Sequence, residues 1–216
     1  MPDPKTPGLA AVRHDAPRPR SALHDAPHVE AADRATWRAW LEANHAAESG
    51  AWLVTWRPGS GMPVLDYEAS VEEALCFGWI DSQGGRVDER RSKLYFARRK
   101  PRSAWAASNK ARVERLTAAG LMAPAGLAAI ERAKANGAWN HLDPIERLEV
   151  PDDLQAALDA GPPAAGHWAA FPPSVRKMML AWIADARRSA TRAARVAETA
   201  RLAARNERPI AGRPKG

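Results

Sequence analysis

Four cations directly precede a predicted helix in the middle of the chain. They are Arg98, Arg99, Lys100 and Arg102, and Ser103 follows them. A serine at the N-cap of a helix accepts a hydrogen bond from the free N–H groups of the first turn. A helix N-terminus also carries a partial positive charge, which favours anions. These residue types at this spacing predict an anion-binding site.

A carboxylate is expected to approach these cations from a neighbouring strand. The segment ALCFGWIDS, residues 74–82, reads as the end of a helix, a turn at Gly78 and the start of a strand. Trp79 and Asp81 share one face of that strand, because side chains alternate along it. We expect Trp79 in the core and Asp81 at the strand end, close to the arginine-rich turn.

The helix predicted after Ser103 adds an amide to the same place. Trp105, Asn109 and Val113 are four residues apart and so share one helix face. Two interpretations stay open: Asp81 and an arginine form a filled salt bridge that fixes the junction, or the polar groups line an open ligand pocket. The candidate ligand-binding residues are Trp79, Asp81, Arg98, Arg99, Arg102, Ser103, Trp105 and Asn109.

No motif in the sequence requires catalysis, a metal or a cofactor. Cys76 is the single cysteine, and the nearest histidine in sequence is His45, on a different predicted helix. A cysteine without a base to activate it is predicted to be a buried structural thiol. The sequence contains no serine nucleophile elbow, P-loop or dinucleotide fingerprint. We favour a non-enzymatic protein without catalytic residues or cofactors, and leave an enzyme or sensor that binds a small anion as an alternative.

The net charge of +7 is concentrated in the C-terminal part of the chain. Residues 31–146 carry sixteen basic and fourteen acidic side chains, whereas residues 147–216 carry twelve and seven. Such an excess favours an anionic ligand or an acidic protein partner, and nucleic acid is a less favoured alternative. Solvated basic helices without a partner would also explain it. The basic surface of the last predicted helix consists of Arg188, Arg192 and Arg195.

The elements that position these residues are those of a small α+β domain. Strands are predicted at 51–57, 79–82 and 93–99, and helices at 33–49, 66–77, 104–119 and 124–136. Asp33 is predicted to cap the first helix. The expected fold is a small antiparallel sheet packed with helices.

An all-helical segment is predicted after this domain. The clearest stripe runs from Ser174, with Val175, Met178, Met179, Trp182 and Ile183 at helical spacing. Further helices are predicted from Pro151 and from Ser189. The predicted organisation is a disordered tail over 1–30, rich in proline, an α+β domain over 31–146, a helical segment over 147–206 and a frayed tail over 207–216.

Several motifs resemble one known family. ALCFGWIDS (74–82), FARRKPRSAWAASN (96–109) and GLMAPAGLAAIERAKANGAW (120–139) are similar to the YdeI/OmpD-associated, or bacteriocin-protection, family. Residues 172–196 resemble its C-terminal helical part. The family pattern has phenylalanine-x-proline-arginine where this chain has Phe96-Ala97-Arg98-Arg99, so the chain departs from it at Arg98, and it departs again at Ala106, where the family has serine.

The resemblance implies protection against bacteriocins or cationic antimicrobial peptides, as part of envelope-stress resistance. It implies no particular reaction. The sequence shows no apolar stretch long enough to span a bilayer and no export signal. We therefore expect a cytoplasmic protein.

Overall fold

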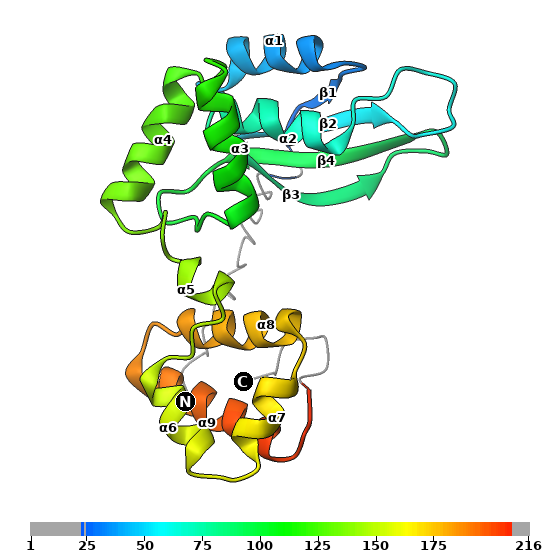
Figure 1. The fold of residues 1–216 in the computed structure, drawn as a ribbon. Coiled ribbons are helices and arrows are strands. Elements are labelled where there is room, and N and C mark those ends of the chain that lie inside the picture. The colour runs from blue at the N-terminus through cyan, green and yellow to red at the C-terminus, as the bar shows by residue number, and fades with distance from the viewer. Residues whose placement is uncertain (1–22, 24, 209–216) are drawn as a thin grey trace, which may run out of the picture. The chain divides into compact units, whose positions relative to one another are not determined.

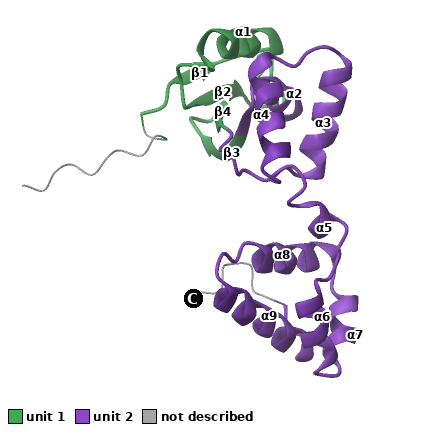
Figure 2. Ribbon diagram, turned by 90° about the vertical axis from the view of Figure 1, so that its left-hand side faces the viewer, with its two compact units in different colours: residues 1–67, 81–98 green, residues 68–80, 99–216 purple. Residues whose placement is uncertain are grey.

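The computed structural model describes residue 23 and residues 25–208. These residues contain one four-stranded sheet and nine helices (Figure 1), so the predicted α+β class with a helical C-terminal part is confirmed. They divide into two compact units (Figure 2). The first contains the described residues up to Tyr67 together with Asp81–Arg98, and the second contains Glu68–Ile80 and the residues from Arg99 onward.

The sheet is mixed, with the strand order β1-β2-β4-β3. Its strands are β1 His28–Glu30, β2 Gly50–Trp56, β3 Trp79–Arg86 and β4 Arg91–Arg98. β2 pairs antiparallel with β4, whereas β1 pairs parallel with β2. The prediction of a purely antiparallel sheet is therefore wrong at β1, and the predicted tail over 1–30 ends too late. Residues 1–22 of that tail lie outside the described residues.

Helix α1, Arg34–Asn44, covers one face of the sheet in the first unit. The Asp33 carboxylate accepts a hydrogen bond from the Thr36 N–H at 2.8 Å, which confirms the predicted N-cap. Trp37 is fully buried, and its ring centroid lies 5.4 Å from that of Phe96 on β4. The cap and this aromatic contact fix the start and the direction of α1 on the sheet.

On the opposite face of the sheet, basic side chains of the sheet and its connecting turn lie over the aromatic rings. Trp52 and Tyr95 face each other across β2 and β4, on the side away from Phe96. The Lys93 ammonium lies 4.3 Å from the ring centroid of Trp52, and the Arg90 guanidinium lies 5.2 Å from that of Trp56. Long basic side chains can shield apolar surface while their charges stay in water. The Trp52 indole N–H also donates to the Leu23 carbonyl at 2.9 Å, and Trp52 is buried.

Three helices form the first part of the second unit. They are α2 Tyr67–Cys76, α3 Ala107–Ala118 and α4 Pro124–Ala135. Two carboxylates on α2 bind arginines on α3: Glu68 lies 2.6 Å from Arg112, and Glu72 lies 2.6 Å from Arg115. Each pair joins one exposed and one largely buried side chain, and the two pairs together align the helices.

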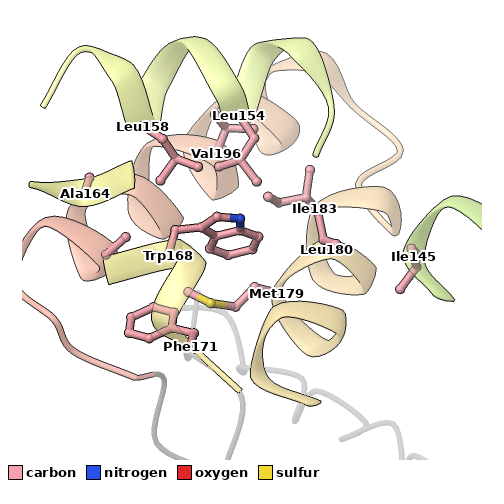
Figure 3. Packing of buried hydrophobic residues seen from close by; sticks show 11 residues of the cluster. Ile145, Leu154, Leu158, Ala164, Trp168, Phe171, Met179, Leu180, Ile183 and Val196 are labelled. Carbon is pink, nitrogen blue, oxygen red and sulfur yellow. The ribbon is translucent and has the colours of Figure 1, made fainter. Parts of the chain in front are cut away.

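The last five helices pack around one tryptophan. They are α5 Asp143–Glu146, α6 Asp152–Asp159, α7 Ala164–Ala170, α8 Pro173–Ala184 and α9 Ser189–Ala204. Figure 3 shows Trp168 of α7 between Leu154, Leu158 and Val196 on one side and Met179 and Phe171 on the other.

The predicted stripe on α8 is confirmed only in part. Met179 and Ile183 are buried in this core, but Met178 is 44% exposed. No helix was predicted over α7, because its seven residues contain a single large apolar side chain, Trp168. Among all the described helices, none is long and apolar enough to cross a membrane.

Candidate functional site

Asp81 and Arg98, the two charges predicted to meet at the junction, are bound to other partners in the first unit. Asp81 accepts a hydrogen bond from the Tyr67 hydroxyl at 3.0 Å. Arg98 donates to the carbonyls of Ala46 and Glu48 at 3.1 and 2.7 Å. The expected ion pair between Asp81 and Arg98 is therefore not formed. The physical reason is that carbonyls just beyond the end of α1 attract a guanidinium.

In the second unit, the structure brings together Arg99 and Trp105. The Arg99 guanidinium is 3.7 Å from the ring centroid of Trp105 and 3.4 Å from the Ala104 carbonyl. Both residues are buried, and the Trp105 ring packs against Trp139 at 4.9 Å between centroids. The main-chain N–H of Arg99 donates to the Gly78 carbonyl at 3.0 Å. Arg99 and Trp105 thus form a packed core contact that contains the buried positive charge of the guanidinium.

Ser103 does not cap a helix. α3 begins only at Ala107, and its N-cap residue is Ala106, whose side chain has no oxygen to accept a hydrogen bond. The predicted helix start at Ala104 is wrong, and with it the prediction that Trp105 shares a helix face with Asn109. The segment over 103–106 instead runs outside any helix, and its Trp105 ring lies under Arg99.

The remaining predicted site residues lie in different surroundings. Trp79 is fully buried, as expected for a core residue. Asn109 accepts a hydrogen bond from Arg112 at 2.9 Å, and Arg102 is exposed. A ligand-binding role for these eight residues stays a prediction. Among the described residues, no group of three or more His, Cys, Asp and Glu side chains could hold a metal ion.

Two of the three arginines predicted as a basic surface take part in contacts within the helical part. Arg192 binds both carboxylate oxygens of Asp153 at 2.7 and 2.9 Å. Arg195 donates to the Trp182 carbonyl and lies 5.2 Å from its ring centroid. Arg188 precedes α9 and is exposed. Arg192 is therefore paired with a carboxylate, whereas Arg195 keeps its positive charge.

Asp153 should make stability depend on pH. Its hydrogen bond with Arg192 holds the pKa of this carboxyl below the ordinary value of 3.8. A group with a lowered pKa in the folded state stabilises the fold above its unfolded pKa, and this effect is lost as pH falls through the folded pKa. We expect Asp153→Asn to melt below the wild type at pH 7, with a difference that shrinks on acidification below pH 3.8.

Thermal unfolding followed by circular dichroism across this range measures the effect. The exposed neighbour Asp152 supplies a matched control, Asp152→Asn. A gap between Asp153→Asn and wild type that stays constant down to the acid limit would contradict the assignment.

A groove of about 380 Å³ lies among α5, α8 and α9 in the second unit. We call it the α5–α8 groove. Its apolar lining includes Ile145, Val150, Leu180, Ile183 and Ala184. Its polar lining is His141, Glu149 and Arg192. Ile145 of α5 and Leu180 and Ile183 of α8 appear together at one side of the helical core in Figure 3.

Sequence reasoning missed this groove. Residues 140–151 show no helical or strand periodicity, and the lining residues come from segments far apart in sequence. One feature of the sequence did mark this region as unusual. Residues 143–159 contain six carboxylates and a single arginine, within a chain of net charge +7.

A second cavity, of about 270 Å³, lies in the first unit beside Glu30, Trp56 and Arg91. Its two charged side chains bind each other, with Arg91 donating to Glu30 at 2.5 Å. Arg91 also binds Asp88 at 2.7 Å. The two charges of this cavity therefore pair with each other across it. The α5–α8 groove is larger and has a more extensive apolar lining, so it is the stronger candidate site.

Comparison with known families gives two matches, which are separated by residues 130–146. Residues 29–129 match a domain family of unknown function (DUF8412). This range holds two of the three N-terminal motifs that suggested the bacteriocin-protection family, and part of the third. No curated protein and no solved structure gives a significant match.

The C-terminal helices match a second family model. The matched range, residues 147–206, contains α6 to α9 and most of the α5–α8 groove. The resemblance inferred from sequence is thus confirmed for this part of the chain. Residues 147–206 match the model of the family described as bacteriocin-protection, YdeI or OmpD-associated.

Proposed function

We propose that this protein protects the cell that makes it against bacteriocins or cationic antimicrobial peptides, as part of resistance to envelope stress. The observation that carries the proposal is the match of residues 147–206 to the bacteriocin-protection family. A cytoplasmic location is part of the proposal.

Protection by binding is favoured over protection by catalysis. Cys76 is fully buried, and its main-chain carbonyl accepts a hydrogen bond from Ala123, as in a structural position. Asp81, Arg98 and Asn109 each have a hydrogen-bond partner within the fold. A nucleic-acid-binding role is less supported, because Arg192 and Arg195 already bind groups of the helical part.

The proposal is tested by survival of a peptide-sensitive bacterial strain. We expect expression of the full chain to raise the minimum inhibitory concentration of a cationic peptide, such as polymyxin B, several-fold over an empty vector. Trp168→Ala, which removes the centre of the helical core, should abolish this gain. The exposed-residue variant Met178→Ala should keep it.

Cell fractionation and immunoblotting in the same strains measure protein level and location. Identical killing curves for wild type and empty vector, at confirmed expression, would refute the protective role. Protein found only in the periplasm or the membranes would refute the cytoplasmic location.

A further inference from the structure

We infer that the α5–α8 groove binds a cationic amphipathic peptide directly, with its apolar lining holding the peptide's apolar side chains and its acidic surroundings attracting the peptide's cations. This inference rests on the proposed protective function and names the ligand class of that function. Nothing in the family description specifies a binding site or a mode of protection.

The apolar part of the groove has the size and rigidity of a binding site. Its volume of about 380 Å³ lies at the lower end of the range of roughly 300 to 1,000 Å³ found for small-ligand pockets. Ile183 and Leu180 belong to the buried core, at 1% and 3% exposure, so packing holds them in place. Val150 and Ala184 are partly exposed and give access to this floor.

The charges around the groove favour a cationic occupant. The six carboxylates over residues 143–159 are Asp143, Glu146, Glu149, Asp152, Asp153 and Asp159. Four of them bind a cation each: Lys110, Lys177, Arg147 and Arg192. Asp159 lies outside the groove lining, so five negative and four positive groups remain near the groove, a net charge of −1. The region is therefore acidic although the whole chain is basic.

The position of two carboxylates strengthens this argument. Glu149 lines the groove, and its partner Arg147 is 61% exposed, so water screens their pairing. Asp152 is exposed and follows Pro151, which also lines the groove. A lysine or arginine of a bound peptide would meet these carboxylates while its apolar neighbours enter the groove. Complementary charges of this kind speed association and select the partner.

Binding is measured by fluorescence anisotropy with the full chain and two labelled probes. The first probe is a synthetic amphipathic helix of lysine and leucine, and the second has glutamate in place of every lysine. We expect the lysine peptide to bind at least about tenfold more tightly, a difference of about 1.4 kcal/mol. Its affinity should fall as salt rises, because salt screens exposed charges.

Two pairs of variants test whether the groove is the binding site. Ala184→Trp fills the groove, and Ala170→Trp places the same side chain at an exposed position on α7 outside the lining. Glu149→Lys reverses a charge of the lining, and Asp159→Lys makes the same change outside it. We expect each groove variant to weaken lysine-peptide binding by about tenfold, and each control by less than about twofold. Melting temperatures confirm that all four variants fold.

The outcomes separate this inference from the proposed function. Equal binding of both probes, tighter binding of the glutamate probe, or full binding by Ala184→Trp would overturn the inference. If such a result accompanied normal protection of cells, the proposed function would stand and the groove would not be its site. Groove-dependent binding of the lysine peptide in a protein that gives no protection would overturn the function and leave the inference intact.

Discussion

Gly126→Ala should destabilise the protein by about 3 kcal/mol, although it adds one methyl group. A Cβ at this position would lie 2.1 Å from the carbonyl oxygen of Cys76 and 2.8 Å from its carbonyl carbon. Both are main-chain atoms, so no side-chain rotation can relieve the clash. The start of α4 would have to move away from the end of α2. That movement would also strain the hydrogen bond from the Ala123 N–H to the same carbonyl, now 3.1 Å long.

Chemical denaturation of wild type and variant measures the loss. The matched control is Gly166→Ala, also within a helix, where an added Cβ would meet no atom within 4 Å. This control should be neutral or should stabilise the protein by up to about 1 kcal/mol, because alanine favours a helix over glycine. Equal effects of the two substitutions would show that the close approach of α4 to Cys76 does not constrain the fold.

Trp168→Ala should cost about 3 to 5 kcal/mol, enough to unfold the C-terminal helices in a marginally stable protein. The Trp168 side chain is 4% exposed and contacts residues from several helices at the centre of the core (Figure 3). Its removal leaves a cavity that four short helices cannot fill by a small shift. We expect loss of the near-ultraviolet circular dichroism of this part and a lower unfolding midpoint.

Trp168→Phe distinguishes the effect of losing the aromatic packing from the effect of the unpaired indole N–H. The buried indole Nε1 of Trp168 has no hydrogen-bond partner among the described residues. Phenylalanine keeps most of the aromatic contact and removes this unpaired donor, so its cost should be clearly smaller than that of alanine. On the surface of the same helical part, Met178→Ala should change stability by no more than about 0.5 kcal/mol. A cost for Trp168→Ala as small as this would contradict the central role of the tryptophan.

The parts of the fold predicted from sequence are those with a strong local signal. Asp33 caps α1 because an aspartate three residues before Thr36 satisfies a free N–H with no help from the rest of the chain. The alternation of Trp52, Val54 and Trp56 marks β2 in the same way. β1 was missed because its three residues, His28–Glu30, are too few to show alternation and gain their order from pairing with β2.

The candidate site was harder to predict because tertiary contacts override local preference there. Ser103 has the right chemistry for a cap, but the burial of Trp105 beneath Arg99 keeps its segment out of the helix. Arg98 was expected to bind a carboxylate, yet main-chain carbonyls beyond α1 are its partners. The α5–α8 groove depends on residues about 40 positions apart, such as Ile145 and Ile183, which no local pattern connects.

The parallel pairing of β1 with β2 also covers the outer side of a largely buried strand. β2 consists of the largely buried sequence GAWLVTW, and β4 occupies one of its sides. Its other side would be an open edge of unpaired N–H and C=O groups, which is a template for a strand of another molecule. β1 pairs with Trp52, Leu53 and Val54 at the middle of that edge. A segment of three residues, too short to be recognised as a strand in the sequence, thus closes the apolar strand β2 to intermolecular β-sheet formation.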